Sequence, residues 1–323
     1  MKRLDIHQPH DFFEYVRLDG AAVPPADPRK LDVAVLDMNH AWPNVGHDAL
    51  IHALLEIAEK ERERLTPAGR VVRVISFDVR RRHEIPSSPN GRFRLYLGTG
   101  GPGHLNPREN DGEKSWAQGI RENAAWEAPL FRLFDAVAAS RDTALLAVCH
   151  SFGLLCRWSG AARPELRDRK SSGMPLNALS DEAAAHPWFS RFAERLPDRR
   201  HFYVVDNRLF DLVPDRIGTA TPLAFESVER NVLTMVEIDR EPGSGMPRIF
   251  GANHHPEIID REHIMSVLDQ KRAHGEVTEE WYRERAGTLA DLFHGERERQ
   301  SRLTSEFTLL GLLRHHLARL IAE

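Results

Sequence analysis

The sequence predicts an α/β fold: a doubly wound, mostly parallel sheet with helices on both faces and a helical appendage at the C-terminus. Two observations lead to this prediction. Short apolar runs alternate with helical patterns along residues 31–260, which is typical of βαβ units whose strands are covered on both faces. Beyond residue 260 the alternation stops, and apolar residues recur only at helical spacing.

The same change of pattern divides the 323-residue chain into three predicted regions. Residues 1–30 are an N-terminal extension, residues 31–260 the α/β domain, and residues 261–323 a C-terminal helical extension. The last helix carries an apolar stripe, which we expect to pack on the main domain. A homodimer interface formed by these C-terminal helices is the alternative.

The elements of the α/β domain are predicted in chain order. Strands are expected where a short apolar run is bounded by turn residues, and helices where apolar residues recur at i, i+3, i+4 and i+7. On this basis the strands are 31–36, 71–77, 93–97, 143–148, 202–205, 232–238 and 248–252, and helices surround residues 49–57 and 130–137.

Two long polar segments interrupt this plan. Residues 105–117 and 159–178 are rich in Asp, Asn, Arg, Ser, Gly and Pro, so we expect surface loops that border the functional site. The second segment carries basic residues that are candidates for binding an anionic group of the substrate, although charges in a polar loop are more often only solvated: Arg163, Arg167, Arg169 and Lys170.

Composition excludes several classes of protein. The formal net charge is −4, which leaves no excess of positive charge for general nucleic-acid binding. No apolar run approaches the roughly 20 residues that a helix needs to cross a bilayer. The N-terminal segment also lacks the apolar region of a signal peptide. We therefore expect no membrane and no nucleic-acid partner.

The two cysteines, Cys149 and Cys156, are predicted to be free thiols. They lie seven positions apart, about 10.5 Å along a helix, and a disulfide needs Cα atoms roughly 4.4–6.8 Å apart. Free thiols favour a cytoplasmic location. We expect no metal: the pair His315–His316 lies in the last helix without a neighbouring carboxylate or cysteine in the sequence, which predicts a solvated helical face.

Cys149 follows an apolar strand and precedes a segment that should enter a helix. A strand, a sharp turn and a helix place a nucleophile at the top of a parallel sheet, with backbone N–H groups free to bind an oxyanion. The small residues Ala147 and Ser151 flank the turn, as close backbone packing requires. Taken alone, a cysteine in an apolar segment is more often buried and inert.

Two further stretches complete a constellation around Cys149. His255 follows a predicted strand, with Glu257 two residues later, so the two can serve as a general base and the carboxylate that orients it. Gly100 and Gly101 follow another predicted strand and offer backbone N–H groups for the second oxyanion donor. The adjacent His254 is expected to be an exposed loop histidine.

Together these stretches resemble the class I, or triad-type, glutamine amidotransferases, over roughly residues 31–260. The likeness lies in Gly100-Gly101-Pro102-Gly103, in Ala147-Val148-Cys149-His150-Ser151, and in Gly251 to His255-Pro256-Glu257. The resemblance implies a flavodoxin-like glutamine amidotransferase fold and no cofactor. It also implies site roles: nucleophile Cys149, base His255, orienting Glu257, and an oxyanion and substrate-binding loop of Gly100, Gly101 and His150.

The sequence departs from the family at positions that contact glutamine. Four residues after the nucleophile, where the family usually has a glutamine, this chain has Gly153. The segment that usually carries a His-Ser substrate contact is Val204-Val205-Asp206-Asn207-Arg208. The triad pattern is thus retained while the pattern for recognising glutamine is weakened.

Three hypotheses for function follow. The first is an amidase or amidotransferase that acts on glutamine or a γ-glutamyl compound through a thioester, with any ammonia-using synthetase on a separate chain. The second is acyl transfer resembling that of the homoserine acyltransferases, which share this fold type and a Cys/His/Glu triad. The third is a catalytically silent binding subunit, which the intact triad pattern disfavours.

Overall fold

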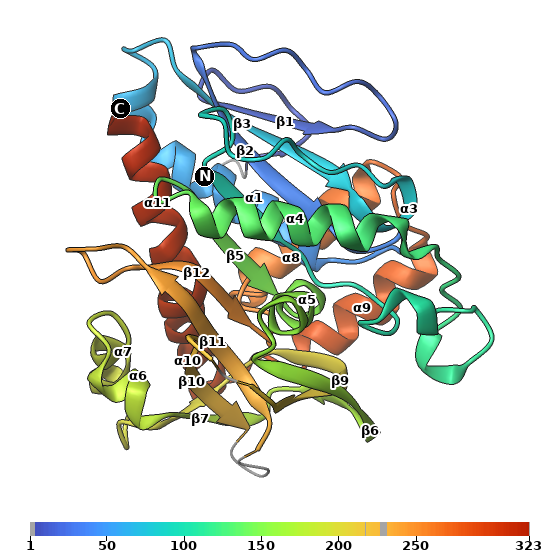
Figure 1. Ribbon diagram of the computed structural model, residues 1–323. Coiled ribbons are helices and arrows are strands. Elements are labelled where there is room, and N and C mark those ends of the chain that lie inside the picture. The colour runs from blue at the N-terminus through green and yellow to red at the C-terminus, as the bar shows by residue number, and fades with distance from the viewer. Residues whose placement is uncertain (1–3, 217, 227–230, 323) are drawn as a thin grey trace.

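A mixed sheet of ten strands forms the centre of the molecule (Figure 1). The computed structural model describes residues 4–216, 218–226 and 231–322. From one edge to the other the strands are β1 (Phe13–Arg17), β3 (Val71–Asp78), β2 (Lys30–Asp37), β4 (Leu95–Gly98), β5 (Ala144–Val148), β12 (Pro247–Ala252), β11 (Leu233–Arg240), β10 (Thr221–Glu226), β7 (Leu176–Leu179) and β8 (His201–Tyr203).

The first six strands in this order are parallel, and the remaining four continue the sheet in antiparallel pairings. This arrangement confirms the predicted mostly parallel α/β sheet. The predicted strands at 31–36, 71–77 and 143–148 correspond to β2, β3 and β5. β5 lies in the middle of the sheet, between β4 and β12.

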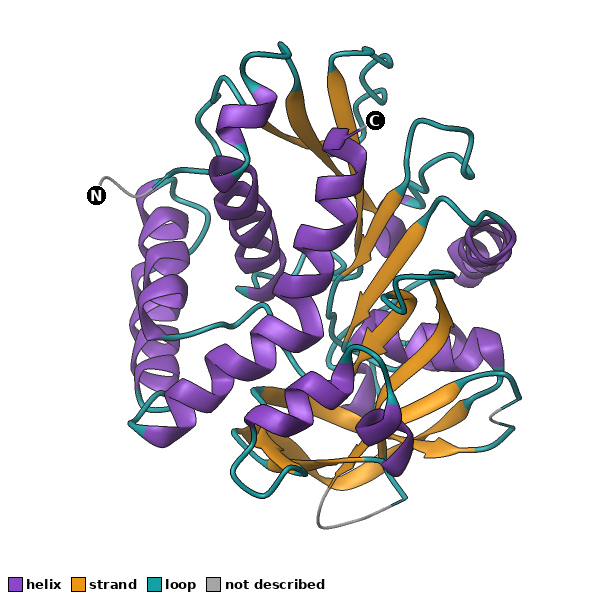
Figure 2. Cartoon of the chain, turned by 90° about the vertical axis from the view of Figure 1, so that its left-hand side faces the viewer, coloured by secondary structure: helices purple, strands orange, loops and turns teal. Residues whose placement is uncertain are grey.

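Helices cover both faces of the sheet, as Figure 2 shows. Along β2, Val33 and Val35 point into the core beneath α1 (Gly46–Lys60) and α11 (Gly311–Ala322), whereas Ala34 and Leu36 point into the core beneath α4 (Glu127–Ala139) and α5 (His150–Ser159). Alternate residues of a strand face opposite sides, so a strand buried on both faces has a continuous apolar sequence.

The remaining helices are short or lie after the sheet. A π-helical turn at Glu306–Leu310 leads into α11. The others are α2 (Arg62–Leu65), α3 (Val79–Arg82), α6 (Asp181–Ala185), α7 (Phe189–Arg195), α8 (Arg261–Ala273), α9 (Glu279–Ala290) and α10 (Glu296–Ser305).

The prediction of a loop at residues 159–178 is wrong. Most of this segment is a strand, β6 (Ala162–Gly173), which pairs antiparallel with β9 (Asp206–Pro214) in a separate two-stranded ribbon. Most β6 side chains are exposed or half-buried, so its polar sequence has no apolar alternation to reveal a strand. Pairing with β9, distant in sequence, supplies the hydrogen bonds. By contrast, 105–117 is irregular apart from short 3₁₀ turns, as expected.

Both terminal regions pack against the α/β sheet. β1, within the predicted N-terminal extension, pairs with β3 at the sheet edge, while residues 1–3 of that extension lie outside the described residues. The C-terminal helices bury their apolar stripe in the main core through Phe307, Leu313 and Leu317. This stripe is thereby covered within the chain, so a dimer would need another surface. The division into three regions stays a prediction.

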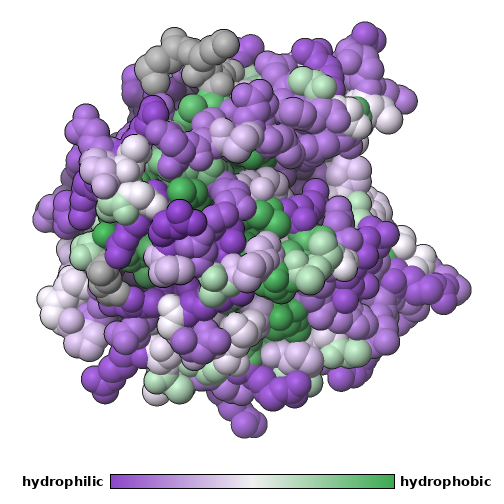
Figure 3. Space-filling view, turned by 90° about the horizontal axis from the view of Figure 1, so that it is seen from above, coloured by the Kyte–Doolittle hydropathy of each residue, from purple (hydrophilic) through white to green (hydrophobic). Residues whose placement is uncertain are grey.

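The surface seen from above is mainly hydrophilic, with apolar residues in small separate groups (Figure 3). Large hydrophobic side chains are instead concentrated in the cores: among the described residues, only Val23, Trp42 and Leu166 of the large hydrophobic residues are exposed. None of the helices in the described ranges has the length and apolarity required to span a bilayer.

Candidate active site

The carboxyl ends of three adjacent strands bring the predicted site residues together. Gly98, at the end of β4, pairs with Ala147 of β5, and Ala252, at the end of β12, pairs with Val148. The glycine loop, Cys149 and the segment from Asn253 therefore leave the same edge of the sheet side by side. Ligand sites in open α/β sheets form at such an edge.

Cys149 occupies a strained turn between β5 and α5. Its φ is +49° and its ψ is −102°, a conformation that a non-glycine residue adopts only when its surroundings impose it. Two hydrogen bonds hold the turn: the Cys149 N–H donates to Ala252 O at 2.8 Å, and the Gly153 N–H donates to Cys149 O at 3.0 Å. Ser151 further ties the helix to the neighbouring loop, since its hydroxyl donates to Thr99 O at 2.7 Å.

His255 is fixed by a buried carboxylate and presents its other nitrogen. Its Nδ1 lies 2.8 Å from Glu257 Oε1, while Nε2 is buried without a hydrogen-bond partner. Burial opposes the charged form, but the neighbouring Glu257 carboxylate and the Cys149 sulfur raise the pKa of His255 well above its usual value. Glu257 also faces the first residue of α1: a Cβ at Gly46 would lie 2.6 Å from Oε1.

The glycine loop approaches this pair so closely that side chains are excluded. A Cβ at Gly100 would lie 2.9 Å from His255 Cε1 and 3.5 Å from Cys149 Cβ. A Cβ at Gly101 would lie 2.2 Å from Met38 O. Within the described chain, the backbone N–H groups of Gly100 and Gly101 donate to no protein acceptor, and so they remain available to a ligand.

The glycine loop is held from behind by Arg80, the first residue of the basic run Arg80-Arg81-Arg82. Side chains in such a run are usually solvated, but Arg80 is 1% exposed. One of its Nη atoms donates to Met38 O at 2.8 Å and to Pro102 O at 2.6 Å. The rest of the guanidinium forms two hydrogen bonds, of 3.0 and 2.7 Å, with the fully buried Glu122. A buried ion pair therefore fixes the loop that carries the candidate oxyanion donors.

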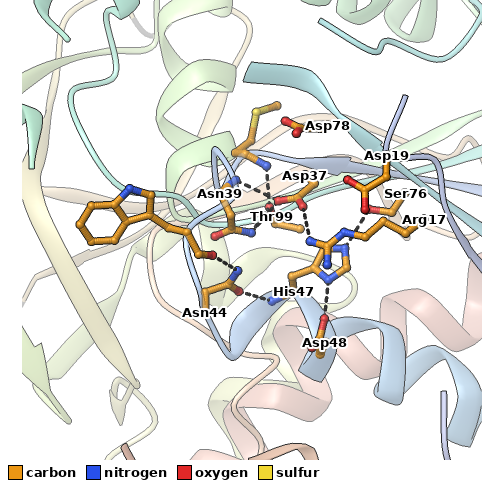
Figure 4. Close-up of polar contacts among 12 residues, drawn as sticks. Arg17, Asp19, Asp37, Asn39, Asn44, His47, Asp48, Ser76, Asp78 and Thr99 are labelled. Carbon is orange, nitrogen blue, oxygen red and sulfur yellow. Dashed lines mark hydrogen bonds and ion pairs between the residues drawn. The ribbon is translucent and has the colours of Figure 1, made fainter. Parts of the chain in front are cut away.

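The loop between β2 and α1 closes another side of the site and is also fixed by polar contacts (Figure 4). Asp37 accepts from both the backbone N–H and the side-chain amide of Asn39, at 2.9 and 2.7 Å. The Met38 N–H donates to Thr99 Oγ1 at 2.9 Å, which joins this loop to the start of the glycine loop. Asn44 Oδ1 accepts a hydrogen bond from the His47 N–H in the first turn of α1, at 2.8 Å.

A cavity of about 420 Å³ opens in front of Cys149, His255 and Glu257. Its walls are the glycine loop, the loop between β2 and α1, the β6–β9 ribbon and one face of α9. Cavities of this volume hold small molecules. The β6 strand of the ribbon belongs to segment 159–178, which we expected to border the site, whereas α9 was not expected there. Both elements border the space next to the candidate nucleophile.

Leu105 occupies the space that a side chain at position 153 would need. A Cβ on Gly153 would lie 2.5 Å from Leu105 Cδ1, and Leu105 itself lines the cavity. The family resemblance predicts a glutamine side chain at position 153. Leu105, an apolar residue that follows the glycine loop, fills that space instead. In this part of the cavity a substrate would therefore pack against an apolar side chain and would not hydrogen-bond to a glutamine.

Some of the basic residues predicted in the second loop form ion pairs within the protein, and one is accessible at the cavity. Arg167 forms ion pairs with the buried acids Asp211 and Glu226, so it is not available to a ligand. Arg163 pairs with Glu165. Lys170 lines the cavity and, in the part of the chain that the structure describes, takes part in no ion pair. Only one of the predicted cationic candidates, Lys170, thus reaches the site.

Three histidines predicted to be exposed or solvated lie elsewhere than expected. His254 is fully buried, and its Nε2 lies 3.3 Å from Thr308 Oγ1 of the C-terminal helices. His316 is also buried, with Nε2 2.8 Å from Pro247 O, while His315 Nε2 lies 2.7 Å from Glu241. Glu241, distant in sequence, supplies the carboxylate neighbour that we did not expect. The Arg319 guanidinium also binds Glu241.

Burial of His254 predicts a loss of stability in acid. Burial, followed by the charge of His255, lowers the pKa of His254 to about 3. The unfolded chain therefore binds a proton near pH 6.5 that the folded protein excludes, so stability falls by about 1.4 kcal/mol per pH unit as pH drops from 6.5 toward 3. The free energy of unfolding, measured with urea at pH 7.5 and at pH 5.5, should differ less between the two pH values for His254→Asn than for the wild type. Equal differences would contradict this assignment.

Solved structures provide the comparison that identifies the fold. No family model matches the sequence, and no curated protein sequence does either. A glutamine amidotransferase from Thermotoga maritima is 13% identical, with 91% of this chain and 99% of that chain covered, at a TM-score of 0.51. One from Methylobacillus flagellatus is 14% identical, with 90% and 94% covered, also at a TM-score of 0.51. The chain has the class I glutamine amidotransferase fold.

The glutamine amidotransferase fold confirms the resemblance drawn from the three short motifs, together with the predicted fold class. The likeness extends over about nine-tenths of this chain, so it includes more than the sheet edge that carries the motifs. Sequence identity is too low for it to transfer an activity. The activity that this fold supports depends on the side chains at its site.

Proposed function

We propose that this protein is a cysteine-dependent amidohydrolase of the glutamine amidotransferase type, with Cys149 as nucleophile, His255 as general base and Glu257 as the carboxylate that orients it. The observation that carries the proposal is the hydrogen bond of Glu257 to His255 Nδ1, which leaves Nε2 free beside Cys149 at the turn after β5. This is the arrangement in which an imidazole deprotonates a nucleophile.

The proposed reaction begins with attack of the Cys149 thiolate on the amide carbonyl carbon. Backbone N–H groups of Gly101 and His150, next to Gly100, stabilise the oxyanion, because both residues follow strand ends at the edge of the sheet where the charge develops. The tetrahedral intermediate collapses as imidazolium His255 donates its proton to the departing amine. A thioester on Cys149 remains, and a water molecule deprotonated by His255 hydrolyses it to the acid and the free thiol.

The raised pKa of His255 supports this assignment. The Glu257 carboxylate and the Cys149 sulfur both favour the protonated imidazole, which is the proton donor that the departing amine requires. Both cysteines are free, which agrees with the proposed cytoplasmic location. If ammonia is the useful product, a synthetase that consumes it is the expected partner.

Acyl transfer is the second candidate. Leu105 against Gly153 replaces a polar contact expected for glutamine, and it favours a substrate with more apolar surface. The ordered Cys149 turn argues against the third hypothesis, a silent subunit, because a strained backbone conformation persists at functional positions.

One experiment separates these candidates. The purified protein is incubated with glutamine, and released glutamate is measured; parallel reactions contain a γ-glutamyl amide or an acyl-CoA with an amino-acid acceptor. Amide cleavage supports the amidohydrolase, and thiol release from acyl-CoA supports the transferase. Neither product, together with no alkylation of Cys149 by iodoacetamide at neutral pH, would contradict both enzymatic proposals.

A further inference from the structure

Two histidines and a glutamate meet where α1 packs against α8, and none of them lines the cavity in front of Cys149. His52 and Glu56 lie about one helical turn apart on the same face of α1, and His263 lies in the first turn of α8. One ligand atom from each of the three, an imidazole nitrogen or a carboxylate oxygen, lies within 4.8 Å of the other two. The sequence led us to expect no metal, because these two helices are distant in the chain.

The separation of His52 and Glu56 fits two ligands of one ion better than a hydrogen bond. His52 Nδ1 is 3.7 Å from Glu56 Oε1, beyond the roughly 2.7–3.2 Å of a hydrogen bond. Two ligands of a tetrahedral zinc ion, each about 2.0–2.2 Å from the metal, lie roughly 3.3–3.6 Å apart. His52 is 3% exposed, and within the described chain its Nδ1 has no hydrogen-bond partner. A buried polar atom without a partner is costly, and an ion at this point would remove that cost.

Gln270 of α8 contacts the other imidazole nitrogen of His52. Its side-chain amide lies 3.0 Å from Nε2 and donates to Leu4 O at 2.9 Å, while its Oε1 is buried and has no hydrogen-bond donor among the described residues. Binding of a metal through Nδ1 requires a proton on Nε2 and an acceptor beside it. Rotation of the Gln270 amide by half a turn presents Oε1 to that proton, in exchange for the contact with Leu4 O.

The two other clusters of histidine and carboxylate in the described part of the chain have partners of their own. Glu241, beside His315 and His316, binds the Arg319 guanidinium, so a cation already occupies that position. In a cluster at the surface, each histidine lies within ion-pair distance of its own carboxylate: His7 of Glu276, and His274 of Asp5.

We propose that His52, Glu56 and His263 bind one divalent transition-metal ion of the zinc type, with water as the fourth ligand, and that the ion ties α1 to α8. Two imidazoles and one carboxylate are ligands that zinc binds, whereas magnesium and calcium are held mainly by oxygen. Burial opposes ionisation of Glu56, but the adjacent His52 and then His263 lower its pKa below its usual value, so an anionic ligand is present at neutral pH. The Glu56 side chain is 44% exposed, which gives the ion a path from solvent.

The two helices that the ion joins both lead to the candidate active site. Gly46, the first residue of α1, faces Glu257, and α8 begins shortly after Glu257 in the chain. A buried ion pair of Asp48 with Lys271 already joins the helices, and the ion adds a second connection. Because the ligands come together only in the folded chain, zinc should stabilise the folded protein. This inference does not depend on the chemistry proposed for Cys149.

The test is calorimetric titration of zinc into Cys149→Ala protein that a chelator has freed of metal, so that the candidate nucleophile cannot act as a ligand. We expect one zinc ion to bind per chain and to raise the midpoint of thermal unfolding. Glu56→Gln keeps the size of the side chain and removes its charge, so it should lower the affinity for zinc by about tenfold or more. An excess of magnesium should not displace the zinc, because the site offers only one carboxylate.

His274→Asn is the matched control, since it removes a histidine of the surface cluster just beyond the end of α8 and should leave the affinity for zinc unchanged. His263→Asn, checked for folding by circular dichroism, should weaken zinc binding as Glu56→Gln does. If His263→Asn does not fold, Glu56→Gln decides, because it alters a partly exposed side chain. No binding of zinc, an unchanged affinity in Glu56→Gln, or an equal loss in His274→Asn would overturn the proposal.

Discussion

Replacing Cys149 with alanine is expected to lower the rate of amide cleavage by about 10⁴- to 10⁶-fold, because removal of a nucleophile abolishes the covalent route and leaves only binding and oxyanion stabilisation. Substrate binding should change little, since the side chain is small and the cavity wall is formed by other residues. The measurement is the rate of product release under single-turnover conditions, beside calorimetric binding of the same amide.

Cys156→Ala is the matched control for this prediction. Cys156 lies on the same helix, but it is fully buried in the core and does not line the cavity. Burial raises the pKa of its thiol, which makes it unreactive. Iodoacetamide should therefore label Cys149 alone, with loss of activity in proportion. Retained activity in Cys149→Ala, or labelling at Cys156 instead, would remove Cys149 from the mechanism.

Replacing Arg80 with methionine is expected to lower the free energy of unfolding by about 3–5 kcal/mol, because Glu122 would be left buried without its cation. The same change releases the carbonyls of Met38 and Pro102 and so loosens the glycine loop. We expect kcat to fall more than KM rises, since the N–H groups of Gly100 and Gly101 act when charge develops on the substrate oxygen.

Urea unfolding and steady-state kinetics test the prediction for Arg80. Arg81→Met is the control, since Arg81 is the exposed neighbour and its side chain forms no hydrogen bond or ion pair within the described residues. Arg80→Lys keeps the charge opposite Glu122 but loses the two-point contact, and it should recover stability more than kcat. A stable Arg80→Met protein with normal kcat would show that the glycine loop holds its shape without this ion pair.

These two residues differ in how far the sequence could reveal them. Cys149 stands between an apolar strand and a helix, and local pattern alone placed it at a sheet edge. Arg80 stands in a run of three arginines, and a charged run is usually solvated. Its partner Glu122 lies 42 positions away in a segment without regular pattern. No local signal distinguishes a buried arginine in such a run from its exposed neighbours.

The β6–β9 ribbon shows the same limit. The sequence of β6 is polar because the strand is largely exposed, so it lacks the alternation from which strands are predicted. Its pairing with β9 brings Lys170, Asp206 and Arg208 to the cavity. The sequence predicts Lys170 as a candidate ligand of an anionic group, and the family resemblance points to residues 204–208, but neither predicts the strand pairing that places them there. His254 was misplaced for a related reason: the π-helical turn Glu306–Leu310, whose Thr308 contacts it, comes from the far end of the chain.

By itself the sequence determined the parallel α/β sheet, the strand ends that carry Cys149, Gly100 and His255, and the two-residue spacing of His255 and Glu257. These features are local, because an apolar pattern and the short motif that follows it occupy one short stretch of the sequence. Only the tertiary structure decided which charges are buried, how they are paired and which elements line the cavity. Those properties depend on contacts between segments far apart in the chain. Such contacts bury some charged residues, and a buried charge must be paired, whereas an exposed one need not be.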